Sequence, residues 1–341
     1  MSVIARYLIA STFLFSAVVL AQDNKVLNLY SSRHYQTDEA LYANFTRQTG
    51  IRINRIEAGE DALIERVRNE GERSPADVLV TVDAGRLWRA EQLGFFQPVK
   101  SALLDARIPA SLREPGGLWF GFSLRARLIA YNKAKVQAAE LPAYESLAEP
   151  KLKGRICMRS STNMYNLSLL SAMIDHLGEP RAQAWAQAVR DNLAHDPRGG
   201  DTDQLKSVAA GECDVTLTNQ YYYARLLRSD KPEEREIAGR IGIVFPNQAS
   251  WGTHVNISGA GVMRHAPNRH AAVQFLEYLA GDEAQRYFAD GNNEWPVVAG
   301  VKPDNPVLKM FGDFKRDALN VAVLGRNQPG AQKIYDRAGW K

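Results

Sequence analysis

The pattern of apolar and polar positions along the first third of the chain predicts strands and helices in a regular order. Three short runs, apolar or strictly alternating, predict strands at residues 26–30, 51–56 and 76–82. Apolar residues three or four positions apart predict helices that close at glycines, at residues 37–50, 61–71 and 84–94. This order of strand and helix, repeated three times, predicts a mainly parallel sheet with right-handed crossovers.

A long strand-like stretch at residues 120–132 follows, and the α/β pattern then begins again. Further strands are expected at residues 154–159, 213–217, 241–245 and 252–263. Helices are expected at residues 166–177, 181–193, 203–210, 270–279 and 283–289, with a last helical run at 314–324. The charged segment 230–236 predicts a surface turn.

The breaks in this pattern, near residues 128 and 252, indicate two α/β lobes, the first interrupted by the second. The sequence divides into an N-lobe of residues 22–127 and 252–300 and a C-lobe of residues 128–251 and 301–341. Two or three strands would join the lobes. Ligands in such an architecture lie in the cleft between the lobes.

The N-terminus has the pattern of a secretory signal peptide. Arg6 precedes an apolar stretch at residues 7–20, and small residues up to Ala21 are followed by a polar segment. We expect cleavage after Ala21, because the apolar run is too short for a comfortable membrane span. The alternative is an uncleaved N-terminal anchor.

Composition fits a soluble globular protein, with 23% charged and 45% hydrophobic residues among 341. The net charge of +4 is spread along the chain without a basic stripe, so no nucleic-acid partner is expected. The two cysteines, Cys157 and Cys213, both lie in strand-like runs. An exported protein meets an oxidising environment, which favours a disulfide between them. Two buried free thiols are the alternative.

Tyrosines follow three of the predicted strands, at the strand-to-loop junctions where open α/β sheets place ligands. They are Tyr35 after His34, Tyr165, and the run of three that begins with Tyr221 and Tyr222. Packing at the edge of the core is the ordinary explanation for any one of them. Three tyrosines in one topological position favour a shared role.

Phenolate is a hard oxygen ligand, and the phenol pKa near 10 means that only a strong Lewis acid replaces its proton at neutral pH. Hard oxygen donors select hard cations, among which ferric iron is trivalent. Calcium and magnesium would use carboxylates, and zinc would use cysteine and histidine. Neighbouring residues of a straight strand point to opposite faces, so Tyr221 and Tyr222 can share one metal only where the chain bends. The change from strand to helix at Asn219 supplies such a bend.

Six segments together resemble the periplasmic ferric-ion-binding proteins of iron ABC importers, the bacterial transferrin-like family. The resemblance is closest to the branch that binds iron through tyrosine and histidine without carbonate, and it covers the whole mature chain. The segments are Tyr30–Tyr35, Ala76–Leu79, Leu124–Arg127, Arg159–Asn166 without Thr162, Asn219–Tyr222 and Asn293–Val297. Trp295 stands where the family usually has tyrosine, a change expected to affect packing.

The resemblance implies a type II periplasmic-binding-protein fold and a ferric ion, with Fe(II) also possible, as the transported ligand. The implied iron ligands are His34 and Tyr35 from the N-lobe and Tyr165, Tyr221 and Tyr222 from the C-lobe. Arg125 and Arg33 would lie beside them and balance charge, whereas Tyr223 would be structural. The implied protein is a periplasmic monomer that delivers iron to an ABC permease and is not an enzyme.

Two other functions remain open from the sequence alone. A binding protein of the same fold would hold a small organic anion with Arg33, Arg125 and the tyrosines. A hydrolase would use His34 as a general base, although no serine or cysteine nucleophile can be assigned to it.

Overall fold

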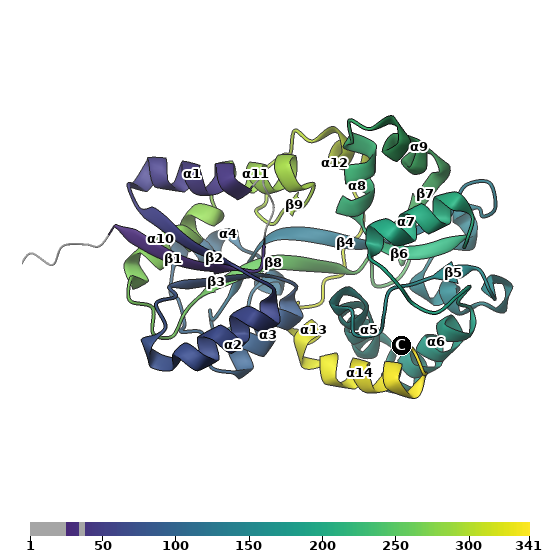
Figure 1. Cartoon of the computed structure of the whole chain (residues 1–341), viewed down its shortest axis with the longest axis horizontal. Coiled ribbons are helices and arrows are strands. Elements are labelled where there is room, and N and C mark those ends of the chain that lie inside the picture. The colour runs from purple at the N-terminus through teal and green to yellow at the C-terminus, as the bar shows by residue number, and fades with distance from the viewer. Residues whose placement is uncertain (1–24, 34–37) are drawn as a thin grey trace, which may run out of the picture.

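The structure is a computed structural model that describes residues 25–33 and 38–341. The predicted signal peptide and the candidate ligands His34 and Tyr35 lie outside the described residues. The chain forms two α/β lobes, with strands β4 and β8 running between them (Figure 1). The predicted two-lobed fold class is confirmed.

The strands form one sheet in the order β2-β1-β3-β8-β4-β6-β5, and β7 and β9 also pair with β4. β1 pairs in parallel with both β2 and β3, as the repeated strand–helix order predicts. β4 pairs antiparallel with β8 along its first half and with β6 and β7 along its second half. The strands are β1 (Val26–Ser31), β2 (Arg52–Glu57), β3 (Val78–Val82), β4 (Phe120–Asn132), β5 (Ile156–Cys157), β6 (Val215–Asn219), β7 (Ile241–Val244), β8 (Val255–Val262) and β9 (Trp295–Pro296).

Helices cover both faces of the sheet in each lobe (Figure 1). They are α1 (Asp38–Thr49), α2 (Glu60–Glu70), α3 (Ala84–Gln92), α4 (Ala102–Arg107), α5 (Met164–Leu177), α6 (Glu179–Asp191), α7 (Asp201–Ala210), α8 (Gln220–Arg228), α9 (Pro232–Arg240), α10 (Arg269–Leu279), α11 (Asp282–Asn292), α12 (Pro306–Phe311), α13 (Ala322–Arg326) and α14 (Gln328–Arg337). None of the described helices has the length and apolar character that a membrane span needs.

Buried side chains form one large hydrophobic cluster in the first lobe and two smaller ones in the second. β4 passes from the first cluster to the second between Leu128 and Ile129. The C-terminal segment contributes to both lobes, because Leu324 packs in the first cluster and Tyr335 in the second. The exact lobe boundaries stay a prediction.

Three local predictions are wrong. Most of the segment 230–236 belongs to helix α9, which begins at Pro232 and which Glu233 and Glu234 favour in its first turn, whereas residues 230 and 231 precede it. Most of the run 314–324 is not helical, because Thr253 pairs with the backbone of Lys315 and Asp317 and holds the chain extended. The strand expected at 154–159 shortens to β5.

The predicted disulfide is confirmed: Cys157 and Cys213 are bonded, with 5.7 Å between their Cα atoms. Cys157 lies in β5 and Cys213 comes two residues before β6, so the bond ties together two neighbouring parallel strands. A tyrosine junction follows each of these strands, at Tyr165 after β5 and at Tyr221 after β6. The disulfide therefore supports the frame from which both junctions emerge.

The middle of β8 lies close to its neighbours at Gly259, opposite Gly121 of β4. A Cβ atom on Gly259 would lie 2.5 Å from the carbonyl oxygen of Phe120 and 2.6 Å from Leu87 Cδ1. The backbone of Phe120 cannot move away easily, since it is part of the sheet. Only glycine fits here.

We predict that Gly259→Ala lowers the free energy of unfolding by about 2 kcal/mol, because the added methyl overpacks the core. Gly239→Ala is the matched control, since a Cβ there meets nothing within 4 Å. Chemical denaturation of both variants checks this prediction. Equal stability of the two variants would contradict it.

Candidate functional site

Tyr165 and Tyr221 each lie in the first turn of a helix. Tyr165 is the second residue of α5, and its backbone N–H donates to the Oδ1 atom of the N-cap residue Asn163 at 3.1 Å. β6 ends at Asn219 and α8 begins at the next residue, so Tyr221 and Tyr222 follow an abrupt change of direction. The bend predicted from the sequence is confirmed.

The structure brings the hydroxyl groups of Tyr165 and Tyr221 together. The Tyr221 hydroxyl donates to the Tyr165 hydroxyl at 3.1 Å, and Asn219 Nδ2 donates to the Tyr221 hydroxyl at 3.3 Å. The ring of Tyr222 lies beside that of Tyr221, with 4.4 Å between the centroids. Tyr223 points elsewhere, because its hydroxyl lies 3.3 Å from two backbone oxygens near α9. Two separate segments thus supply three neighbouring phenols.

Positive charge surrounds these phenols. The guanidinium carbons of Arg125, Arg127 and Arg159 lie 5.9, 5.6 and 5.4 Å from the centroid of the Tyr165 ring. The guanidinium carbon of Arg225 lies 5.1 Å from the Tyr221 ring. A developing phenolate at this position would be stabilised by several cations.

Asp201, the first residue of α7, holds two of the arginines in place. Its carboxylate is fully buried and forms ion pairs with Arg127 at 2.5 Å and with Arg159 at 3.1 Å. The same carboxylate accepts the backbone N–H of Asn219 at 2.8 Å. Asp201 therefore fixes both the charge beside Tyr165 and the start of the turn that carries Tyr221.

The phenol of Tyr165 does not ionise by itself near neutral pH. The pKa of Tyr165 is raised to about 12. Burial is the main cause and the neighbouring phenol of Tyr222 adds to it, whereas the guanidinium of Arg125 partly opposes both effects. Ionising this phenol at neutral pH therefore needs an additional cation.

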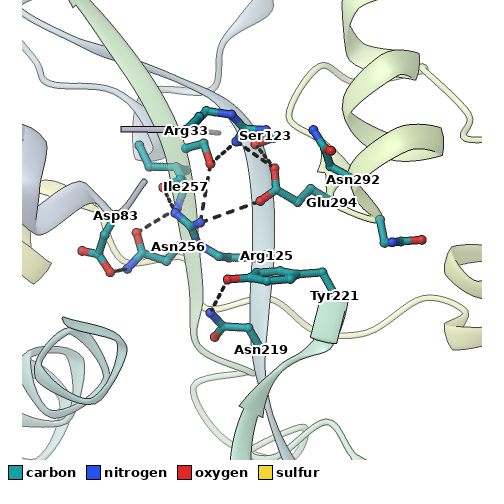
Figure 2. Close-up of polar contacts among 12 residues, drawn as sticks. Arg33, Asp83, Ser123, Arg125, Asn219, Tyr221, Asn256, Ile257, Asn292 and Glu294 are labelled. Carbon is teal, nitrogen blue, oxygen red and sulfur yellow. Dashed lines mark hydrogen bonds and ion pairs between the residues drawn. The ribbon is translucent and has the colours of Figure 1, made fainter. Parts of the chain in front are cut away.

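A second polar network lies in the first lobe around Arg33 and Glu294 (Figure 2). Arg33 pairs with Asp38 at 3.1 Å and with Glu294 at 3.1 Å. Glu294 also accepts the hydroxyl of Ser123 at 2.6 Å and lies 3.7 Å from Arg125. This carboxylate thus connects the two arginines that the sequence analysis placed beside the ligands.

These contacts disfavour the organic-anion alternative. The side chains of Arg33 and Arg125 are only 2% and 1% exposed, and both already face the carboxylate of Glu294. Arg33 also faces Asp38. An additional organic anion would have to compete with these buried carboxylates.

Sequence reasoning missed several groups that the structure places at the site. Arg127 had a usable signal, since residues two apart in a strand share a face and Arg125 was already a candidate. Asp201 had none, because a carboxylate that pairs across the fold looks like any surface acid. Glu294 lies in the segment Asn293–Val297 that carries the family resemblance, but nothing in that segment marks its buried pairing with arginine. Trp295 packs against aromatic rings, including that of Phe314 at 5.0 Å.

Other ligand types do not gather elsewhere in the described part of the chain. Within residues 25–33 and 38–341, no three His, Cys, Asp or Glu side chains are placed to hold a metal ion. The tyrosine cluster is therefore the candidate site that we consider.

A sequence model of the family described as "Bacterial extracellular solute-binding protein" matches residues 73–320, which is more than half of the chain. The chain belongs to this family. As a solute-binding protein it is a transport component and not an enzyme. Two relatives from Synechocystis sp., iron uptake proteins A2 and A1, are each 51% identical to it. The alignments cover 93% and 94% of this chain and 91% and 88% of those proteins.

Solved structures of related proteins have the same fold as this solute-binding protein. The Trichodesmium protein (IdiA, FutA), solved in complex with iron and citrate ligands, is 55% identical with a TM-score of 0.90. The ferric binding protein from Campylobacter jejuni is 40% identical with a TM-score of 0.87. The matches cover 93% and 92% of this chain and all of each relative.

We predict that Asp201→Asn lowers the free energy of unfolding by about 3 kcal/mol or more. The substitution removes the negative charge that balances the guanidinium groups of Arg127 and Arg159, and Arg127 is buried. Asp203→Asn on the same helix is the control. Asp203 is exposed, and among the described residues its side chain bonds only to the N–H of Gly200 at 2.7 Å, so its loss costs about 1 kcal/mol or less. Urea denaturation compares the two, and similar losses would contradict the role of Asp201.

Proposed function

We propose that this protein captures ferric iron in the cleft between its lobes and delivers it to an ABC transporter permease. The observation that carries the proposal is the contact between the hydroxyls of Tyr165 and Tyr221 at 3.1 Å, beside Tyr222. Relatives named as iron uptake proteins, at 51% identity over almost the whole chain, support the same ligand.

The donor set fits a hard trivalent cation. Three phenolates balance the charge of Fe(III), and a further phenolate leaves a negative charge that nearby arginines offset. In this proposal Tyr165, Tyr221 and Tyr222 bind the metal from the C-lobe, and His34 and Tyr35 complete its ligands from the N-lobe. Fe(II) would bind the same groups with less charge compensation.

The lobes in this proposal are residues 22–127 with 252–300 and residues 128–251 with 301–341, and the C-terminal segment contacts both cores. Solute-binding proteins of iron importers work with a membrane permease, and the family is extracellular or periplasmic. We infer a periplasmic monomer whose signal peptide is removed after Ala21. The permease would recognise the iron-loaded form.

Phenolate-to-iron charge transfer gives the first test. Wild-type protein with one equivalent of Fe(III) should develop a red-orange visible band. Tyr221→Phe and Tyr222→Phe should each weaken this band and lower iron affinity by about 100-fold or more, since each removes an anionic ligand. Visible titration and chelator competition measure both effects.

Tyr223→Phe is the matched control, because its hydroxyl faces the carbonyls of Ala238 and Ile241. This variant should keep the band and the affinity. Stoichiometric iron binding without a band, unchanged in the two ligand variants, would contradict the proposal. Binding of an organic anion without metal, measured by calorimetry, would favour the alternative function.

Iron affinity should fall as the pH falls. The raised pKa of Tyr165, about 12, means that its phenol keeps the proton until iron displaces it. Each phenol that ionises on binding therefore lowers the apparent affinity about tenfold for each pH unit of acidification. Chelator competition between about pH 8 and pH 6 measures the slope, after correction for the titration of the chelator. An affinity independent of pH would contradict phenolate binding.

A further inference from the structure

Asp83 has an unusual backbone conformation at the end of β3. Its φ angle is 98°, in a region that residues other than glycine rarely adopt, and its side chain is fully buried. The surrounding structure holds it there: its N–H donates to the carbonyl of Ile257 at 2.8 Å, and its Oδ1 atom accepts the N–H of Gly85 at 2.8 Å. Strained residues of this kind are often found at functional sites.

The carboxylate of Asp83 reaches from the first lobe to the second. It accepts the hydroxyl of Ser168 on α5 at 2.8 Å to one oxygen and 3.0 Å to the other. Asn256 of β8, one of the strands that run between the lobes, donates to the same carboxylate at 2.9 Å. Burial raises the pKa of Asp83, and the nearby guanidinium of Arg125 and the Ser168 hydroxyl oppose that rise.

Helix α5 lies across the boundary between the lobes. Its residue Ala172 packs in the first hydrophobic cluster, whereas Leu169 and Met173 pack in the second. α13 lies between α3 and α5 and contacts both (Figure 1). Asn327, just after α13, donates to the carbonyl of Ser171 at 3.1 Å. The Asp83–Ser168 contact is therefore a buried polar bond across a packed boundary.

Ser168 is three residues after Tyr165 and thus lies on the same side of α5. A bond to Ser168, one turn into the helix, restrains the N-terminal end of α5 and with it the direction of the Tyr165 side chain. The N-lobe would in this way orient a ligand that the C-lobe supplies. Rigid placement of a ligand raises affinity because less freedom is lost on binding.

We propose that Asp83 is a positioning residue for the metal site, which acts through Ser168 to hold Tyr165 relative to the other lobe. This inference rests on the proposed binding of iron by Tyr165. It adds that iron affinity depends on the hydrogen bond between Asp83 and Ser168, although neither residue is a proposed metal ligand.

The test compares two serine variants on one helix. Ser168→Ala removes the hydroxyl that bonds to Asp83. Ser171→Ala, one turn later, removes a buried hydroxyl that has no hydrogen-bond partner among the described residues. We expect Ser168→Ala to weaken Fe(III) affinity about tenfold and to shift the visible band, because Tyr165 is less well held. Ser171→Ala should change neither the affinity nor the band.

Asp83→Asn provides a second variant that does not depend on Ser168→Ala folding. Asparagine tolerates a positive φ and keeps an oxygen for Gly85, but it loses the charge and one acceptor oxygen. We expect the same loss of affinity and the same band shift, with a folded apo-protein by circular dichroism. Thermal unfolding of each apo-variant separates a loss of stability from a change at the metal.

The outcomes distinguish this inference from the proposed function. If wild-type protein shows no visible band with Fe(III), the proposed function fails, and the inference fails with it. If wild-type protein shows the band and both Ser168→Ala and Asp83→Asn bind iron as Ser171→Ala does, only the positioning role is overturned. If Ser168→Ala does not fold, Asp83→Asn decides in the same way.

Discussion

The attraction between phenol oxygen and guanidinium is the interaction on which the arrangement of this site depends. A phenol buried as deeply as Tyr165 resists ionisation, since the low-dielectric interior penalises its anion. Arg125, Arg127 and Arg159 lie near its ring, and the charge of Arg125 reduces that penalty without removing it. The remaining free-energy penalty of ionising the phenol is overcome only if the bound ligand is itself positively charged. This favours a strongly charged cation over a neutral solute.

The arginines are in turn held by buried acids, one on each side of the site. Asp201 fixes Arg127 and Arg159 from the second lobe, and Glu294 contacts Arg125 from the first. A buried arginine without a carboxylate would be costly, and an arginine fully neutralised by one would offer little to a phenolate. Sharing the carboxylate of Asp201 between two guanidinium groups leaves net positive charge beside Tyr165. On the other side, Asp38 also pairs with Arg33, so the two arginines there face two carboxylates.

β4 explains why these groups meet. Arg125 and Arg127 lie on one face of this strand, close to the point where it passes from the first hydrophobic cluster to the second. The ends of β3 and β6 and the start of α5 converge on the same region, bringing Asp83, Tyr221 and Tyr165. A site built from segments so far apart in the chain depends on the relative position of the two lobes.

Local patterns in the sequence predict the parallel order of β1 to β3, the bend before Tyr221 and the disulfide. They fail where distant parts of the chain decide the structure. The run 314–324 has helical spacing, yet backbone hydrogen bonds of Thr253 with Lys315 and Asp317 hold part of it extended. Asp201 is equally hidden, since its buried partners Arg127 and Arg159 lie far along the chain and nothing near it marks a binding site. The segment around Glu294 carries the family resemblance, but the pairing of Glu294 with distant arginines is visible only in the fold.

Resonance Raman spectroscopy of the iron-loaded protein, with excitation in the visible band, tests the central claim most directly. Protein made with ordinary tyrosine is compared with protein made with ring-deuterated tyrosine. We predict enhanced ring vibrations that shift on deuteration, because the band arises from phenolate bound to iron. Iron bound in stoichiometric amount, with no enhanced vibration that responds to deuterated tyrosine, would contradict the account.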